Sequence, residues 1–345
     1  MVKVKKEGII LEPTNLDFEN LAVLNPGCIK VGNEVHMFYR AVREGNYSSI
    51  GYCRLKGPLK VVKRAKRPIL IPELNYEKHG IEDPRIVYLN GKYYLTYMAY
   101  DGKNVVAAYA ISNDLKKWKK QKKITHLISY GELRSYLKGK KIAKRYACFE
   151  IYDKEPGDKE DEVYIWGKDV VLFPKKINGK FALLHRVLPD IHIIYFRNFN
   201  DLTLNYWKAH IKELPNYIVL KAKYWFETRQ IGAGCPPIET DKGWLLIYHA
   251  VQKTKKGNIY RAGAALVDIN NPCKVIARLN YPLFSPEHDW ECKGLVNNVV
   301  FPSGYAIFKD TLYIYYGAAD KRIAVASVNI HELVNELLTK GKTYI

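Results

Sequence analysis

A cluster of charged side chains stands directly before one predicted strand. In the run HGIEDPRIVYLNGKYYLTYMAYDG, which begins at His79, Glu82, Asp83 and Arg85 precede residues that alternate between apolar, aromatic and polar types. A carboxylic acid in such a place can donate a proton to a leaving group, and a guanidinium can bind an anion or tune a neighbouring carboxylate. The same residues could instead form an ion pair at a turn, which is the commoner role of an isolated cluster.

The segment that follows this cluster belongs to a unit that occurs five times. Each copy has a turn, an aromatic-rich alternating strand, a short polar loop and a second strand rich in small residues, as in GNEVHMFYRAVR and SSIGYCRL. Period-two alternation with Tyr, Val, Ile and Phe is typical of β-strands. The copies begin at residues 32, 91, 179, 242 and 309. This spacing predicts an all-β fold, a five-bladed β-propeller, with a pair of immunoglobulin-like sandwiches as the alternative.

Polar residues recur where the first strand of each copy ends. Equivalent strand ends of a propeller converge on one mouth of the central channel, so a propeller explains this recurrence and a sandwich pair does not. We expect one polar pocket at that mouth. The residues are Arg40 and Arg43, Tyr100 and Asp101, His185 and Arg186, Tyr248 and His249, and Asp320.

The chain is predicted to form a single propeller domain over residues 1–345. The longest interval between copies holds a partly helical insertion, at about 126–169, which could act as a lid or as an oligomer contact. After Asn329, apolar residues spaced at i, i+3 and i+4 predict a short C-terminal helix over about 330–338.

Composition narrows the function classes. The net charge of +20 arises from basic residues dispersed along the chain, so we expect no nucleic-acid partner. No signal-peptide pattern and no apolar stretch of roughly 20 residues occurs, so we expect a cytoplasmic protein with no membrane contact. The six cysteines lie far apart without a C-x-x-C pair, which indicates neither a metal site nor a disulfide framework.

The expected pocket combines carboxylates, basic side chains and aromatic rings. Aromatic faces stack on sugar rings, carboxylates and amides bind hydroxyl groups, and a protonated carboxylic acid can donate to a glycosidic oxygen. The basic residues would hold an anion. No GxGxxG, Walker, GxSxG or HExxH motif is present. These features favour sugar chemistry with an anion nearby.

Several motifs, taken together, resemble glycoside hydrolase family 130. They include NPGCIKVGNEVHMFYRAVR, GIEDPRIV, VLFPKKINGKFALLHRV, IGAGCPPIETDKGWLLIYHAV, NNVVFPSG and LYIYYGAAD, and they run in the family's order from about Asn25 to Asn329. The resemblance implies a five-bladed β-propeller. It also implies a mannoside phosphorylase, a glycosyltransferase (hexosyltransferase) that cleaves β-mannosides with inorganic phosphate and inversion to give α-mannose 1-phosphate.

The resemblance assigns roles to individual residues. Asp83 matches the general acid, which acts through a hydroxyl of the bound mannose, and Pro84 would stiffen the loop that carries it. The residues expected to bind phosphate are Arg40, Arg43, Lys176, Arg186, His249 and Tyr260. The residues expected to bind the sugar are Asn25, Glu82, Arg85, Tyr100, Asp101, His185, Asn297, Asn298 and Asp320.

One departure from the family pattern keeps a second reaction open. Several phosphorylases carry a phosphate-contacting Arg after the YDG motif, where this chain has Val105 and Val106. A β-mannosidase of the same family, which uses water, is therefore the alternative. Its base would be one of three glutamates, Glu150, Glu227 or Glu239. A non-catalytic carbohydrate-binding propeller is a third possibility.

Substrates and partners follow from the same resemblance. We expect inorganic phosphate as co-substrate, no cofactor and no metal, and a homo-oligomeric assembly. The linkage, β-1,4 or β-1,2, and the acceptor sugar depend on rim loops. Tyr130, Tyr146 and Trp166 of the insertion are candidates to shape the acceptor site.

Overall fold

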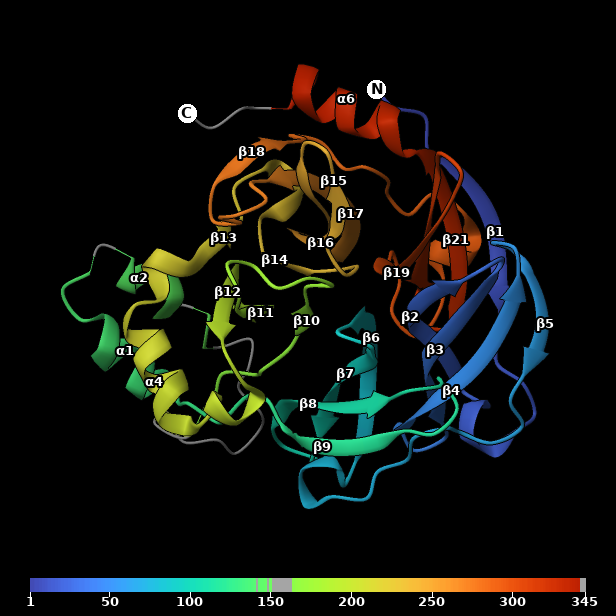
Figure 1. Cartoon of the computed structure of the whole chain (residues 1–345), viewed down its shortest axis with the longest axis horizontal. Helices are drawn as coiled ribbons and strands as arrows, with labels where there is room; N and C mark the ends of the chain where they lie inside the picture. The colour runs from blue at the N-terminus through green and yellow to red at the C-terminus, as the bar shows by residue number, and fades with distance from the viewer. Residues whose placement is uncertain (141, 148, 151–162, 342–345) are drawn as a thin grey trace.

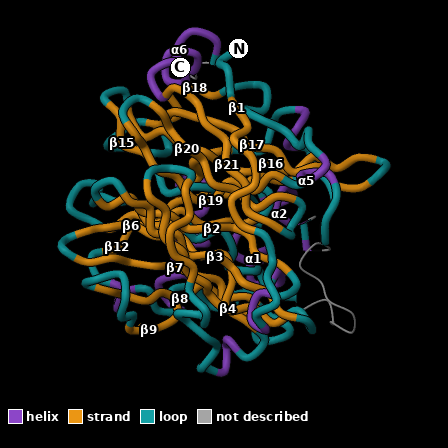
Figure 2. The backbone as a smooth tube through the Cα atoms, turned by 90° about the vertical axis from the view of Figure 1, so that its right-hand side faces the viewer, coloured by secondary structure: helices purple, strands orange, loops and turns teal. Residues whose placement is uncertain are grey.

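The computed structural model describes the chain except for residues 141, 148, 151–162 and 342–345. Four sheets surround a central axis (Figure 1), and the eight-stranded one comprises two antiparallel blades joined by a parallel bridge between Ser48 and Gly80. The strands thus form five blades, as predicted for a five-bladed β-propeller. The side view in Figure 2 shows strands through the body of the molecule and helices at its periphery. The five repeated segments found in the sequence form the second and third strands of the blades, counted outward from the axis.

Each blade runs outward from a first strand that lies nearest the axis. Blade 1 holds β2 (Ala22–Val31), β3 (Glu34–Arg43), β4 (Tyr47–Lys56) and β5 (Lys60–Arg64). Blade 2 holds β6 (Gly80–Leu89), β7 (Lys92–Tyr100), β8 (Val105–Ser112) and β9 (Lys119–Lys123). Blade 3 holds β10 (Val171–Leu172), β11 (Phe181–Val187), β12 (Asp190–Phe196) and β13 (Ile218–Leu220). Blade 4 holds β14 (Gln230–Ala233), β15 (Ile238–Thr240), β16 (Gly243–Thr254), β17 (Gly257–Val267) and β18 (Val275–Arg278). Blade 5 holds β19 (Val300–Phe308), β20 (Thr311–Ala318), β21 (Arg322–Asn329) and β1 (Lys5–Leu11).

The two ends of the chain close the ring together. Strand β1 pairs antiparallel with β21, so the outermost strand of blade 5 comes from the N-terminal region. The C-terminal helix α6 (Ile330–Lys340) starts at Asn329, whose side chain accepts the backbone N–H groups of His331 and Glu332. The N-terminus lies beside α6 (Figure 1), and the Met1 amine is 3.5 Å from Glu336.

The remaining helices lie outside the strands. Helices α1, α2 and α4 pack beside blade 3 (Figure 1), and α1 is capped by Ser129, which accepts the N–H of Glu132. Leu133 and Leu137 of α1 are buried in the core that this blade shares with blade 2. Short 3-10 turns precede several of the inner strands. The helices are α1 (Tyr130–Leu137), α2 (Ala143–Ala147), α4 (Leu204–Lys212) and α5 (Asp289–Cys292), and the turns are η1 (Asp17–Glu19), η2 (Asn75–Glu77), η4 (Phe199–Asp201), η5 (Leu214–Tyr217) and η6 (Trp225–Glu227).

Four blades bury the same group of side chains, which we call the blade triad: a glutamate before the first strand, a tyrosine on the second strand and a cation. In blade 4, Tyr248 donates to Glu227 at 2.7 Å, and Arg278 of the outermost strand pairs with the same carboxylate at 2.5 Å. The triads are Glu19, Tyr39 and Arg64 in blade 1, Glu77, Tyr97 and Lys120 in blade 2, Glu227, Tyr248 and Arg278 in blade 4, and Glu291, Tyr316 and Lys6 in blade 5.

A small residue lies opposite each triad tyrosine on the third strand. Tyr39 faces Gly51 and Tyr248 faces Gly263, and a Cβ atom at either glycine would lie within 2.4 Å of the tyrosine ring. The corresponding partners in blades 2 and 5 are Ala108 and Ala324. The alternation of aromatic and small strands in the sequence therefore reflects rings packed across small side chains within each blade.

Blade 3 departs from this pattern. Its buried carboxylate is Asp190, and the cation and the tyrosine come from helix α2 of the insertion. Arg145 binds both oxygens of Asp190, at 2.6 and 2.8 Å, and the Tyr146 hydroxyl lies 3.0 Å from one of them. The position of the triad tyrosine is taken by His185, which faces His192 across the sheet. The described part of the insertion is thus joined to its blade by charge pairing.

Candidate active site

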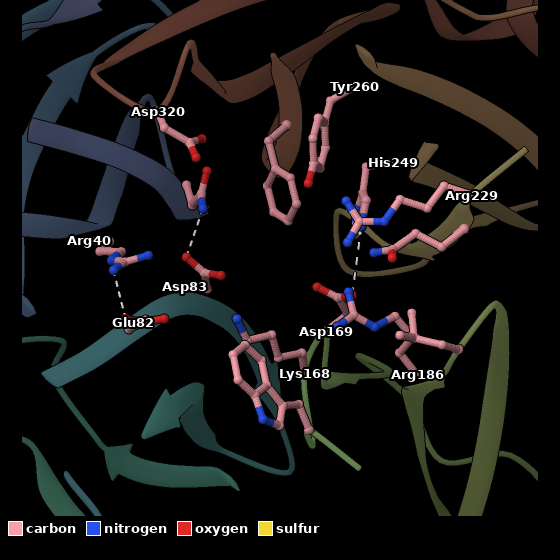
Figure 3. A pocket seen from close by; sticks show the side chains of 15 residues that line it. Arg40, Glu82, Asp83, Lys168, Asp169, Arg186, Arg229, His249, Tyr260 and Asp320 are labelled. Atoms are coloured by element: carbon pink, nitrogen blue, oxygen red, sulfur yellow. Dashed lines mark hydrogen bonds and ion pairs between the residues drawn. The ribbon is translucent and has the colours of Figure 1, made fainter. Parts of the chain in front are cut away.

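One polar pocket opens at the mouth of the channel, and every blade contributes to its wall (Figure 3). Arg40, Glu82, Asp83 and Asp320 lie on one side of it, and Asp169, Arg186, Arg229 and His249 lie on the other. With Lys168, five basic side chains and four carboxylates share one cavity. The residues that line it are Asn25, Arg40, Glu82, Asp83, Trp166, Lys168, Asp169, Arg186, Leu188, Arg229, Gln230, His249, Tyr260, Phe301 and Asp320.

Irregularities in the first strands deliver polar side chains to this pocket. The pairing register shifts between Glu82 and Arg85 in β6 and between Leu24 and Gly27 in β2. At each shift a proline follows a polar residue with a left-handed backbone: Asp83 has φ of 49° and Asn25 has φ of 47°. Such bulges redirect a side chain that the regular pleat would point elsewhere. The charged cluster before the strand thus reaches the channel because of the bulge.

The side of the pocket that carries Asp83 is rich in hydrogen-bonding groups for hydroxyls. The Asn25 side chain donates to Asp83 at 2.7 Å. Arg40 donates to Glu82 at 2.6 Å and to Ser48 at 2.8 Å, which fixes the guanidinium.

The carboxyl group of Asp320 completes this side. Burial raises the pKa of Asp320 to about 6, with Asp83 adding to the increase and Arg40 opposing it. Asp320 also has a left-handed backbone, with φ of 49°. Asp320 therefore takes up a proton at a higher pH than an exposed aspartate does.

The opposite side of the pocket is cationic. Arg186 donates to Asp169 at 2.8 Å, and the His249 ring nitrogen lies 3.7 Å from the same oxygen. The pKa of Asp169 is lowered by Arg186 and His249 in spite of its burial, so this carboxylate stays ionised. Burial lowers the pKa of His249 to about 4, which leaves the imidazole neutral at pH 7.

Aromatic rings pack against two side chains of the pocket. The His249 ring stacks on Phe301 with centroids 4.3 Å apart, and the Lys168 amine lies 4.3 Å from the centre of the Trp166 ring. The backbone N–H of Tyr260 donates to the carbonyl of Asn298, which ties this part of β17 to the segment that precedes β19. Burial raises the pKa of Tyr260, so its hydroxyl keeps its proton.

The structure brings half of the residues predicted to bind phosphate or sugar, and the predicted acid, to this pocket. They are Asn25, Arg40, Glu82, Asp83, Arg186, His249, Tyr260 and Asp320. Arg40, Arg186, His249 and Asp320 come from equivalent ends of the second strands, as expected for a propeller. His185 points away because it precedes Arg186 in a strand whose side chains alternate between faces, and its ring nitrogen bonds with that of His210 at 2.8 Å.

The other predicted residues also lie outside the pocket. Arg43 is exposed and stacks on Tyr47, and the Lys176 amine lies over the Phe181 ring. Tyr100 donates to the carbonyl of Gly102. The remaining ones serve the backbone or lie behind the pocket: Asp101 accepts two N–H groups of its own loop, Asn297 accepts the N–H of Gly294, Asn298 acts through its carbonyl, and Arg85 is buried.

Sequence reasoning missed six lining residues besides Leu188. Lys168 and Asp169 stand directly before β10, in a segment that the sequence placed at the end of the insertion. Arg229 and Gln230 stand at the start of β14 in the same way. A charged residue directly before a first strand is the signal that identified Asp83, and it could have found these as well. Trp166, named only as a candidate to shape the acceptor site, and Phe301 complete the set.

The residues named for the missing arginine, for the base of a hydrolase and for the acceptor site all lie outside the pocket, apart from Trp166. Val105 and Val106 are packed in the core between blades. Glu227 belongs to its blade triad, Glu239 pairs with Lys175 at 2.8 Å and Glu150 pairs with Arg134. Tyr130 and Tyr146 are fully buried.

Two searches of the described residues bear on other functions. Over residues 1–341, apart from the undescribed positions, no group of three or more His, Cys, Asp or Glu side chains is arranged to hold a metal ion. In the same part of the chain, no helix has the length and apolar character needed to cross a bilayer. The acidic stretch at 157–161 of the insertion lies outside the described residues.

Comparisons with known proteins agree with this geometry. The glycoside hydrolase family 130 model, described as beta-1,4-mannooligosaccharide phosphorylase, matches residues 9–339. A beta-1,2-mannobiose phosphorylase of Thermoanaerobacter sp. (strain X514) is 36% identical over 95% of this chain and 97% of its own length. A 1,2-beta-oligomannan phosphorylase of the same organism is 33% identical over 96% of this chain and 99% of its own length.

A solved structure shares the fold. The beta-1,2-mannobiose phosphorylase of Listeria innocua, in complex with beta-1,2-mannobiose, superposes with a TM-score of 0.72 at 22% identity, over 97% of this chain and 99% of that one. At this identity the likeness shows the fold alone. The family match spans nearly the whole chain, so the chain belongs to glycoside hydrolase family 130.

Proposed function

We propose that this chain is an inverting β-mannoside phosphorylase that transfers mannose from a β-1,2-linked mannoside to inorganic phosphate. The observation that carries the proposal is the division of one pocket into a side with the acid Asp83 and an opposite, cationic side. An in-line displacement needs the leaving group and the attacking group on opposite faces of the sugar. The pocket supplies a place for each.

The linkage is proposed from the relatives. Two relatives named for β-1,2 substrates align with at least 95% of this chain. A relative named beta-1,4-mannooligosaccharide phosphorylase aligns with only 49% of it, although the family model carries the β-1,4 description. A whole-length alignment compares every loop around the pocket and a half-length one does not, so the whole-length relatives are the better guide.

The acid side performs the first half of the reaction. Asp83 protonates a hydroxyl of the bound mannose while the proton of that hydroxyl moves to the glycosidic oxygen, whose bond to the anomeric carbon breaks. Asn25 orients the Asp83 carboxyl through their 2.7 Å hydrogen bond. Asp320 and the paired Arg40 and Glu82 hold hydroxyl groups of the sugar and keep the anomeric carbon facing the cationic side.

The cationic side binds phosphate, whose oxygen attacks the anomeric carbon to form α-mannose 1-phosphate. Arg186 and Lys168 supply charge, Tyr260 supplies a hydroxyl donor, and neutral His249 can donate an N–H. Preorganised charge-assisted donors are worth a few kcal/mol each in a desolvated site. Lys168 takes the role predicted for Lys176, and Arg229 adds a guanidinium to a site whose expected Arg is replaced by buried Val106.

The same geometry disfavours hydrolysis. A hydrolase needs a carboxylate base on the side opposite the acid, and Asp169 is the carboxylate located there. Asp169 is paired with Arg186 and its pKa is lowered, which makes it a weak base.

Phosphorus NMR of the purified protein with β-1,2- and β-1,4-linked mannosides, with and without phosphate, tests the proposal. We expect α-mannose 1-phosphate from the β-1,2 substrates and no turnover without phosphate. Free mannose released at equal rates under both conditions would show a hydrolase, and no product from either panel would refute both reactions.

A further inference from the structure

Arg85 of the EDPR motif lies behind the pocket, with only 2% of its surface exposed. Its Nε donates to the carbonyl of Gly234 at 2.7 Å, and its Nη1 donates to the carbonyls of Asp83 at 3.2 Å and Pro84 at 3.1 Å. In the described part of the chain it forms no ion pair with a carboxylate. The guanidinium therefore donates hydrogen bonds to three backbone carbonyl oxygens.

A buried charge without a directly paired carboxylate is costly. Arg85 is stabilised by those three carbonyls, by the Phe301 ring 5.7 Å away, and by longer-range attraction to Asp83 and Asp169. Burial nevertheless lowers the pKa of its guanidinium. A hydrophobic residue of similar length would avoid this cost. What it would lack is the guanidinium's set of several hydrogen-bond donors on one rigid plane, so we infer that these donors are the role of Arg85.

Two of the three carbonyls that Arg85 binds belong to the bulge that presents Asp83. Asp83 has φ of 49°, in the left-handed region that is strained for a non-glycine residue. Pro84 has no N–H group with which to anchor the bulge to a neighbouring strand. The hydrogen bonds from Arg85 to the Asp83 and Pro84 carbonyls replace the missing ladder contacts.

Gly27 of β2 bounds the bulge from another direction. A Cβ atom at this position would lie 2.7 Å from the Pro84 carbonyl oxygen and 3.3 Å from the Arg85 Cα. Only a glycine lets β2 approach this closely. The peptide between Pro84 and Arg85 is thus confined between the backbone of β2 and the guanidinium of Arg85.

We propose that Arg85 is a positioning residue: its guanidinium holds the Asp83–Pro84 bulge in its left-handed form, so that the Asp83 carboxyl faces the mannose hydroxyl through which its proton reaches the glycosidic oxygen. The inference rests on the proposed function in one respect, that Asp83 is the acid. Arg85 touches no substrate in this account and acts only through the backbone of Asp83.

The test compares Arg85→Met and Arg85→Lys with Arg278→Met. Arg278 is the matched control because it is also 2% exposed and belongs to the blade 4 triad, away from Asp83. We expect Arg85→Met to lower kcat about 100-fold with the KM for phosphate unchanged, as displaced catalytic groups do. Arg85→Lys keeps the charge but cannot bind three carbonyls, so we expect a smaller fall, about tenfold. Arg278→Met should lower the melting temperature and leave kcat unchanged.

A substrate with a good leaving group identifies the route of the effect. β-Mannosyl fluoride needs little protonation, so the loss in Arg85→Met should shrink to a few-fold with it. Gly27→Ala, which pushes on the same peptide from β2, should show the same pattern. Equal losses with both substrates, or wild-type kcat in Arg85→Lys, would overturn the inference.

A crystal structure of Arg85→Met gives a readout that does not depend on activity. The Asp83 backbone should leave the left-handed region, and an unmoved Asp83 would overturn the inference. Absence of mannose 1-phosphate in the wild-type protein would instead refute the proposed function. In that case the same kcat ratios can be read from released mannose.

Discussion

Two neighbours on one strand, Tyr248 and His249, show how this protein divides its polar residues. Tyr248 points into blade 4 and donates to Glu227, which is also paired with Arg278. His249 points to the pocket, stacks on Phe301 and lies 3.7 Å from Asp169. Tyr39 and Arg40 divide in the same way in blade 1. One face of the second strand holds the blade together, and the other face serves the pocket.

The blade triads and the pocket use the same residue types, but they differ in how fully their charged groups are paired with one another. In a triad, carboxylate, tyrosine and cation satisfy one another, and the Glu227 carboxylate also accepts two backbone N–H groups. In the pocket, Asp83 stands on the side opposite Arg186 and Arg229, and only some of the charged groups are paired with each other. We infer that closed charge groups stabilise the fold and that separated groups are held ready for a substrate.

The largest expected effect comes from the acid. Asp83→Asn removes the proton donor, so kcat should fall about 10³-fold, within the range for general acids, while the melting temperature stays close to wild type. Steady-state kinetics with a β-1,2-mannoside measure it. Asp101→Asn is the control, because Asp101 binds only the N–H groups of its own loop. A fall of less than tenfold in Asp83→Asn would remove Asp83 from the role of acid.

Breaking a triad should have the opposite profile. Glu227→Gln leaves the buried Arg278 without its carboxylate, which should lower the free energy of unfolding by about 3–5 kcal/mol. The kcat of the folded fraction should be unchanged, because Glu227 lies outside the pocket. Urea denaturation and kinetics on the same preparation measure both. Unchanged stability together with lost activity would reverse the roles that we assign.

Two lysines separate the structural assignment from the sequence-based one. Lys168→Met removes a cation from the pocket and should raise the KM for phosphate about 10- to 100-fold, which corresponds to a charge-assisted hydrogen bond of about 1.5–3 kcal/mol. Lys176→Met removes a cation that lies over Phe181 and should leave this KM unchanged. Phosphate titrations of both variants at saturating mannoside measure the difference. The opposite ranking would restore the sequence-based assignment.

A further predicted effect is a loss of stability in acid. The pKa values of His192 and His249 are lowered to about 4 and that of His210 to about 3, and the pKa of His185 is also depressed, by burial in each case. Below about pH 6.5 the unfolded chain therefore binds protons that the folded chain does not, and stability falls toward pH 4. Asp320, whose pKa is raised, opposes this as a single group. Urea denaturation at pH 7 and pH 4.5 measures it, and equal midpoints would contradict it.

Much of the fold could be predicted because each blade repeats one local pattern. Two strands per blade carry period-two alternation, and these strands form as expected. The first strands were harder to predict, since β10 has two residues and β14 has four. The contribution of β1 to blade 5 depends on pairing across the whole chain, which no local pattern reveals.

The pocket could be predicted only in part, for reasons of register. Strand ends identify which segments reach the mouth, but not which of two neighbours faces it, so His185 and Arg186 were both expected there. The sequence placed Asp83 in a loop before the strand, and the structure places it in a bulge within β6. The Lys168 and Asp169 pair was attributed to the insertion. Lys176 was chosen from its motif alone, and the structure places it outside the pocket.

The most direct test of this division is a paired measurement on Tyr248→Phe and His249→Gln, with melting temperature and kcat/KM determined for both. The account predicts that Tyr248→Phe loses stability and keeps its kcat/KM. It predicts that His249→Gln keeps its melting temperature within a few degrees and loses kcat/KM by at least about tenfold. Equal losses of activity in both variants, or loss of stability alone in His249→Gln, would contradict the claim that one face of the strand builds the blade and the other serves the reaction.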